Sequence, residues 1–133
     1  MIVSALANEV RTADAQAWLQ AQPADTVLMS EWTITEFSSA LALKMRTGVF
    51  DAQSRAAALA AFQALVLPSV RVVAISGATF RRAAGMIDQS AIGLRAADAL
   101  HLAVAVEQGA TLWTLDQGMA AAGAQLGVAT QRL

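Results

Sequence analysis

Apolar residues along the chain follow two patterns, one with the spacing of a helix and one typical of short buried strands. Ile34, Phe37 and Leu41 recur every three or four positions, which predicts an amphipathic helix. Ser30 is placed to cap the start of this helix. Gly48 is placed to end it.

Two other segments are apolar throughout. Val70–Ile75 is rich in β-branched residues and predicts a buried strand. Leu94–Gln108 predicts a helix that is apolar almost all the way round and that ends at Gly109. A helix of that kind has to be packed on several sides.

Strands and helices alternate along the whole sequence. The predicted helices are about Ile2–Gln20, Glu31–Arg46, Asp51–Leu67, about Gly77–Asp88, Leu94–Gln108 and Met119–Leu126. The predicted strands are Thr26–Met29, Val70–Ile75, Thr111–Leu115 and Val128–Arg132. Such alternation indicates a helix-rich α/β fold in three layers, with a parallel central sheet between helices. Binding sites in such folds collect at the carboxyl ends of the strands.

Composition limits the protein class. The chain has 133 residues, which fits one domain over residues 1–133 because domains hold about 100–200 residues. It has no cysteine, which excludes a disulfide framework and a thiolate metal site and is compatible with the cytoplasm that we expect. The net charge of −1 offers no basic footprint, so nucleic-acid binding has to be argued from a site.

No targeting or membrane segment is expected. The apolar start Met1–Leu6 is followed by Glu9 and Arg11 and has no basic region before it, unlike a secretory signal. The uncharged run between Arg55 and Arg71 is shorter than the roughly 20 residues of a spanning helix. A soluble protein is the expectation.

Among the ten acidic residues, three are candidates for chemistry. Asp98 lies on the most apolar helix, where a buried carboxylate is costly unless it is paired or binds a metal. Its alternative role is a helix-dipole partner beside Arg95. Asp116 follows the strand Thr111–Leu115, and its alternative role is to cap the next helix. Glu36 lies on the less apolar side of its helix, semi-buried, with a plain surface position as the alternative.

These three carboxylates can converge at the carboxyl edge of one parallel sheet. Asp98 begins the helix before a strand, Asp116 leaves that strand, and Glu36 is on the helix after another strand. Clustered carboxylates suit hard cations such as Mg²⁺ or Mn²⁺. Such ions orient phosphates and activate water, so phosphodiester hydrolysis is the chemistry that fits.

Three blocks of the sequence resemble PIN-domain proteins of the VapC toxin type. They are SEWTITEFSSAL (Ser30–Leu41), RAADALHLAVA (Arg95–Ala105) and LWTLD (Leu112–Asp116). The resemblance implies a metal-dependent endoribonuclease that cleaves RNA and is inhibited by a small antitoxin of the VapB type. It implies that Glu36, Asp98 and Asp116 are metal-site carboxylates, and that Thr114 supplies a hydroxyl that supports the site.

The sequence departs from this family at its start. The family begins with a strand ending in an Asp, and MIVSALANE resembles only the helix after that Asp. We expect that the start codon is placed too late, because the other motifs are intact. The alternative is a truncated relative that binds an antitoxin without catalysis. An unrelated flavodoxin-like or receiver-like domain is disfavoured, because the chain begins with a helix.

Other polar and aromatic residues have two interpretations each. His101 lies one turn after Asp98 and belongs to packing or to the site. The arginines either contact RNA phosphates or lie on a solvated helix face. The tryptophans either pack in the core or stack on bases. These residues are Arg81, Arg82 and Arg95, and Trp18, Trp32 and Trp113.

Spare apolar residues on the helix Asp51–Leu67 suggest an interface. They exceed what one buried face needs, and such surface often marks a partner contact. We expect this helix and the helix Glu31–Arg46 to form an antitoxin groove or a homodimer interface, with normal core burial as the alternative.

Overall fold

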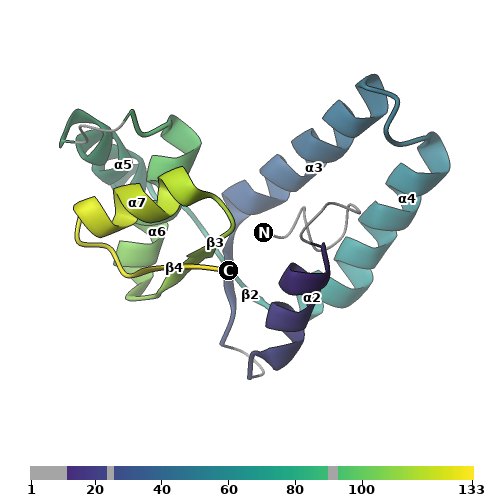
Figure 1. The fold of residues 1–133 in the computed structure, drawn as a ribbon, viewed down its shortest axis with the longest axis horizontal. Coiled ribbons are helices and arrows are strands. Elements are labelled where there is room, and N and C mark those ends of the chain that lie inside the picture. The colour runs from purple at the N-terminus through teal and green to yellow at the C-terminus, as the bar shows by residue number, and fades with distance from the viewer. Residues whose placement is uncertain (1–11, 24–25, 90–92) are drawn as a thin grey trace. The chain divides into compact units, whose positions relative to one another are not determined.

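The computed structural model describes residues 12–23, 26–89 and 93–133, and the chain divides into two compact units, residues 1–74 and 75–133. Each unit is described by itself. Unit 1 contains α2 (Thr12–Ala21), β1 (Leu28–Ser30), α3 (Glu31–Arg46), α4 (Ala52–Ala61), η1 (Phe62–Val66), η2 (Leu67–Ser69) and β2 (Arg71–Val73). Unit 2 contains α5 (Gly77–Gln89), α6 (Ala96–Gln108), β3 (Leu112–Thr114), α7 (Gln117–Gln125) and β4 (Thr130–Arg132) (Figure 1).

The helices of unit 1 begin where short polar side chains satisfy their first free N–H groups. The Thr33 N–H donates to Ser30 Oγ at 3.4 Å at the start of α3. The Ser54 N–H donates to Asp51 Oδ1 at 2.7 Å at the start of α4. This hydrogen bonding lowers the pKa of Asp51. Gly48 adopts a φ of +73° after α3, a conformation that glycine reaches without strain. The predicted cap at Ser30 and the predicted stop at Gly48 are confirmed, and Asp51, where the next helix was predicted to open, caps α4.

A cluster of apolar side chains from α3, α4 and the segment after α4 forms the core of unit 1. Phe37 and Phe62 stack with ring centroids 4.4 Å apart. Leu41 beside them is fully buried, as the helical spacing predicted. Stacked aromatic pairs of this kind add to the stabilisation from buried area. The cluster therefore ties α3 to the end of α4.

The helix predicted over Asp51–Leu67 is continuous, but its form changes in the second half. α4 ends at Ala61, a π-helical turn continues it through Val66, and Pro68 lies in a short 3₁₀ turn. Pro68 has no N–H to continue the helix. The wider turn keeps Phe62 and Val66 in the core while Leu65 is 68% exposed.

Strand pairing in unit 1 is parallel and short. Leu28 pairs with Arg71 and Ser30 with Val73. The strands are shorter than the predicted Thr26–Met29 and Val70–Ile75, and β1 extends one residue further to Ser30. The N-terminal helix ends at Ala21, close to the prediction, and its predicted part before Thr12 lies outside the described residues.

Unit 2 is built on α5 and α6. Five residues spread around α6 are buried, so the predicted packing on several sides is confirmed: Ala99, Leu100, Leu102, Ala103 and Ala105. Gly109 ends α6 with a φ of +60°. The buried Thr79 near the start of α5 donates its hydroxyl to Glu107 near the end of α6. The two helices therefore run antiparallel.

The remaining elements of unit 2 are β3, β4 and α7. Leu112 pairs in parallel with Thr130, and Thr114 with Arg132. Gly123 of α7 lies so close to β4 that a Cβ there would be 2.2 Å from Thr130 Cγ2. The Thr130 hydroxyl also donates to Ala120 O at 3.2 Å. These contacts hold α7 against the strand pair.

The α/β class and the parallel direction of the strands are confirmed. The described strands form two two-stranded sheets, one in each unit, rather than one continuous central sheet. β1 pairs with β2 inside unit 1, and β3 pairs with β4 inside unit 2. The assignment of residues 1–133 to a single domain stays a prediction.

Candidate functional site

Hydrogen bonds to one residue before it and one residue after it in the chain hold Asp116 in place. Its N–H donates to the hydroxyl of Thr114 at 3.0 Å. Its carboxylate oxygen Oδ1 accepts the Met119 N–H at 2.7 Å and caps α7. The capping role weighed from the sequence is therefore present. A carboxylate has about four lone-pair positions, so capping one helix N–H is compatible with binding a cation.

The surroundings of Asp116 leave its carboxylate accessible. Asp116 is exposed, whereas Thr114 before it is buried. A Cβ at Gly118 would lie 3.1 Å from Asp116 Oδ1. A side chain at position 118 would therefore crowd the carboxylate, and glycine keeps this space open. Thr114 orients the backbone from which the carboxylate projects.

Asp98 lies in the first turn of α6 and is half-buried. After α6 the chain turns back at Gly109, where the Ala110 N–H donates to Ala105 O, and enters β3. Asp98 therefore lies at the start of α6, and Asp116 lies beyond β3, the element that follows α6 in the chain. Convergence of these two carboxylates stays a prediction.

Glu36 lies on α3 in unit 1. It is half-buried, as predicted, and precedes the fully buried Phe37. Across the residues that the structure describes, no group of three or more His, Asp or Glu side chains is placed to hold a metal ion. The donors at each of the three positions are of the type that Mg²⁺ and Mn²⁺ prefer. Convergence of Glu36 with Asp98 and Asp116 stays a prediction.

The other candidates from the sequence take varied positions. His101 is half-buried on α6, and Arg81, Arg82 and Arg95 are exposed. Arg95 is the N-cap residue of α6 without a capping side chain. All three tryptophans are partly buried, in line with a packing role: Trp18, Trp32 and Trp113.

Sequence reasoning missed the role of Glu107. Glu107 is not among the three candidate carboxylates, but it accepts the hydroxyl of Thr79, which is 1% exposed. Thr79 also exchanges hydrogen bonds with Ser76, which caps α5. The spacing of Ser76 and Thr79 could have revealed this cap. No local signal could have revealed Glu107, which lies 28 residues away.

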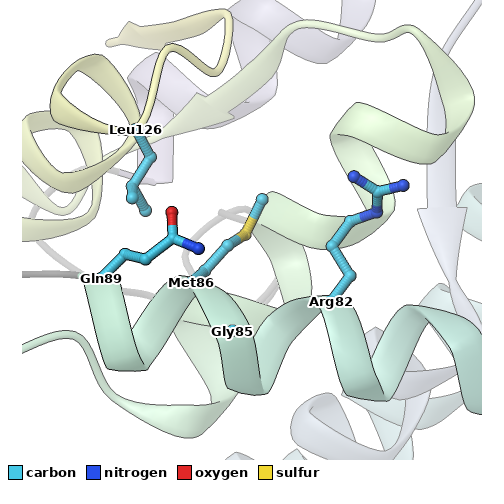
Figure 2. Close-up of a pocket in the computed structure, with 5 residues that line it drawn as sticks. All are labelled: Arg82, Gly85, Met86, Gln89 and Leu126. Carbon is cyan, nitrogen blue, oxygen red and sulfur yellow. The ribbon is translucent and has the colours of Figure 1, made fainter.

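A pocket on unit 2 was also missed. It has a volume of about 350 Å³ and is lined by Arg82, Gly85, Met86, Gln89 and Leu126. Figure 2 shows Met86 and Gln89 extending from α5 toward Leu126, with Arg82 further along the same helix. The spacing of the four α5 residues places them on one helix face. This spacing was readable from the sequence, but the contribution of Leu126 was not.

Comparison with known proteins defines the class of this α/β protein. The family model for the PIN domain matches residues 1–125, and the chain belongs to the PIN-domain family. Proteins of this family are generally nucleases, often metal-dependent, and act on nucleic acid. No curated protein and no solved structure matched the chain. In the described part of the chain, every helix is too short or too polar to cross a membrane.

Proposed function

We propose that this PIN-domain protein is a metal-dependent endoribonuclease toxin of the VapC type. It hydrolyses RNA phosphodiesters in the cytoplasm and is neutralised by a small VapB-like antitoxin. The observation that carries the proposal is the match of the PIN-domain model to residues 1–125, in a chain with Asp98 in the first turn of α6 and Asp116 at the N-cap of α7.

In this proposal Glu36, Asp98 and Asp116 would hold Mg²⁺ or Mn²⁺ through their carboxylates. A bound cation would supply Lewis acidity and a more acidic water for hydrolysis of the phosphodiester. Thr114 is a positioning residue, because its hydroxyl accepts the Asp116 N–H. The cap on Asp116 Oδ1 orients the same carboxylate. Two hydrogen bonds thus set its direction before a cation arrives, which lowers the cost of ordering it.

The partner proposal rests on exposed apolar residues of unit 1. Leu43 on α3 is 52% exposed, Val49 in the loop after α3 is 65% exposed, and Leu65 is 68% exposed. Exposed apolar residues mark protein contacts where they lie together, and Leu43 and Val49 are six residues apart at the end of α3. The antitoxin or a second copy of the chain covers these residues. Replacing Leu65 by Ser should weaken antitoxin pulldown or shift the sizing profile; a lone monomer without antitoxin binding would contradict the proposal.

A second candidate function is a PIN-like protein that binds an antitoxin or another partner without catalysis. The observation that favours it is the set of exposed apolar residues on unit 1, because a partner could cover them whether or not the chain cleaves RNA. This candidate and the nuclease differ in two measurable properties, metal binding and RNA cleavage.

The test is RNA cleavage by the full chain with Mg²⁺ or Mn²⁺, with EDTA and Asp98→Asn as controls for the site. Asp88→Asn is the matched variant, since Asp88 is an exposed carboxylate at the end of α5. Cleavage should be lost in EDTA and in Asp98→Asn and kept in Asp88→Asn. A folded chain that never cleaves, alone or with either cation, would leave the binding candidate.

Metal binding has a readout that does not depend on activity. A cation that binds only the folded chain stabilises it by about 2.7 kcal/mol at a concentration of 100 Kd. Thermal unfolding should therefore shift upward in Mg²⁺ or Mn²⁺ for the unchanged chain and for Asp88→Asn. Asp98→Asn should lose the shift. Equal shifts in all three proteins would show that the cation binds elsewhere.

A further inference from the structure

The pocket between α5 and the end of α7 lies outside the acidic site. Arg82, Gly85, Met86 and Gln89 occupy one face of α5, and Leu126, which follows α7, closes the opposite wall (Figure 2). Gly85, in the middle of this helix face, has no side chain, and a Cβ at its position would have no other atom within 4 Å. The pocket is therefore open where any other residue would place a side chain.

The lining of the pocket combines a positive charge, an amide and two apolar side chains. Arg82 is exposed and is the charged member of the lining among the residues that the structure describes. Gln89 carries an amide that donates and accepts hydrogen bonds. Met86 and Leu126 supply apolar walls. A nucleotide presents the complementary groups, namely a phosphate, a base edge with donors and acceptors, and a flat apolar base face.

The position of the pocket relates it to the carboxylates of the same unit. Thr79 near the start of α5 bonds Glu107 near the end of α6, and Gln89 and Asp98 each lie about 14 Å along their own helix from that bond. Asp116 caps one end of α7 and Leu126 follows the other end. A nine-residue helix is about 14 Å long. A short single strand of RNA spans such a separation.

We infer that this pocket is a subsite for one nucleotide of single-stranded RNA, with Arg82 at a phosphate and Gln89 at a base edge. The inference rests on the proposed nuclease function and adds a place where the substrate is held away from the cleaved bond. Arg and Gln are among the side chains that contact phosphates and base edges. The positive charge of Arg82 favours the polyanion over a basic peptide.

The test fills the pocket without disturbing the helix. Gly85→Leu places a side chain in the open space, and leucine is a better helix former than glycine, so the variant should fold and melt no lower than the unchanged chain. Gly85→Ala is the matched control, since it changes helix propensity and leaves most of the pocket empty. Binding of a labelled single-stranded RNA is measured by anisotropy in EDTA, and cleavage of the same RNA is measured with Mg²⁺.

Gly85→Leu should weaken RNA binding about tenfold and raise KM with little change in kcat, because one base loses its contacts. Arg82→Ala should also reduce the dependence of log affinity on log salt by about 0.7. Arg81→Ala is its control, because Arg81 Nη1 lies 3.4 Å from the Cβ position of Gly77, back along α5 from the pocket.

The outcomes distinguish a failure of the RNA subsite from a failure of the proposed nuclease function. If the unchanged chain cleaves RNA and Gly85→Leu binds and cleaves equally well, the pocket is no RNA subsite while the nuclease stands. If the unchanged chain neither binds nor cleaves RNA, both are overturned. If RNA affinity is unaltered in Gly85→Leu but self-association in sizing is lost, the pocket contacts a second copy of the chain, and the RNA subsite is wrong.

Discussion

Replacing Gly123 by Ala tests the packing of α7 against β4, the contact that holds the helix behind Asp116. A Cβ at position 123 would lie 2.2 Å from Thr130 Cγ2, 2.9 Å from Thr130 Oγ1 and 3.0 Å from Leu102 Cδ2. Interiors are close-packed, so α7 or β4 has to move by about 1 Å to restore an ordinary contact. Overpacking of this kind typically costs about 1–3 kcal/mol.

The gain in helix propensity works against this cost. Alanine is better than glycine in a helix by about 1 kcal/mol. Gly123→Ala should therefore lower the free energy of unfolding by about 0–2 kcal/mol, the difference between the two effects. Gly85→Ala on α5 makes the same chemical change in open space and should raise it by about 1 kcal/mol. The difference between the two variants, about 1–3 kcal/mol, isolates the clash.

Urea unfolding measures both variants, with the midpoint and the slope recorded to show that only stability changed. Combining Gly123→Ala with Thr130→Ser removes the nearest atom, Cγ2, and keeps the hydroxyl that bonds Ala120 O. The double variant should recover part of the loss, which a double-mutant cycle quantifies. The reasoning would be refuted if Gly123→Ala were as stable as Gly85→Ala, or if Thr130→Ser gave no recovery.

Three further predictions follow from the hydrogen bonds. Asp116→Asn should keep the cap on α7 and lose metal-dependent cleavage, whereas Asp116→Ala should also lower the free energy of unfolding by about 0.5–2 kcal/mol. Thermal unfolding measured beside a cleavage assay separates the capping role from the metal-site role. Equal stability of the two variants would contradict the cap. Thr79→Val should lower the free energy of unfolding by about 1–3 kcal/mol, since it breaks the bond to Glu107 and the links within the α5 cap; an unchanged urea midpoint would count against it. The pKa of Asp51 is lowered in the folded chain from 3.8 by its hydrogen bonds to Ser54, so its ionised form stabilises the fold above that pH, and this contribution is lost as the pH falls through the lower folded pKa. Acid titration of stability should therefore show a smaller loss for Asp51→Asn than for the unchanged chain, and identical acid profiles would refute it.

Local features of this protein were determined by the sequence alone. Ser30 and Asp51 begin their helices, and Gly48 and Gly109 end theirs, at the predicted positions. Each of these features depends on atoms within three or four residues, so a short stretch of sequence contains both partners. The α/β class was readable for the same reason, since it follows from the order of local elements. The short strands were predicted less well, because their ends depend on the pairing partner.

Tertiary structure decided the features that join distant parts of the chain. The Thr79–Glu107 bond, the contact of Gly123 with Thr130 and Leu102, and the pocket closed by Leu126 all link different elements. The π-helical turn that begins at Phe62 likewise places its buried side chains in a core shared with α3. A residue's type and its neighbours in sequence do not reveal which distant side chain it meets, because that is set by packing. The sequence alone therefore determined the elements and the candidate carboxylates, and packing decided which of their side chains meet.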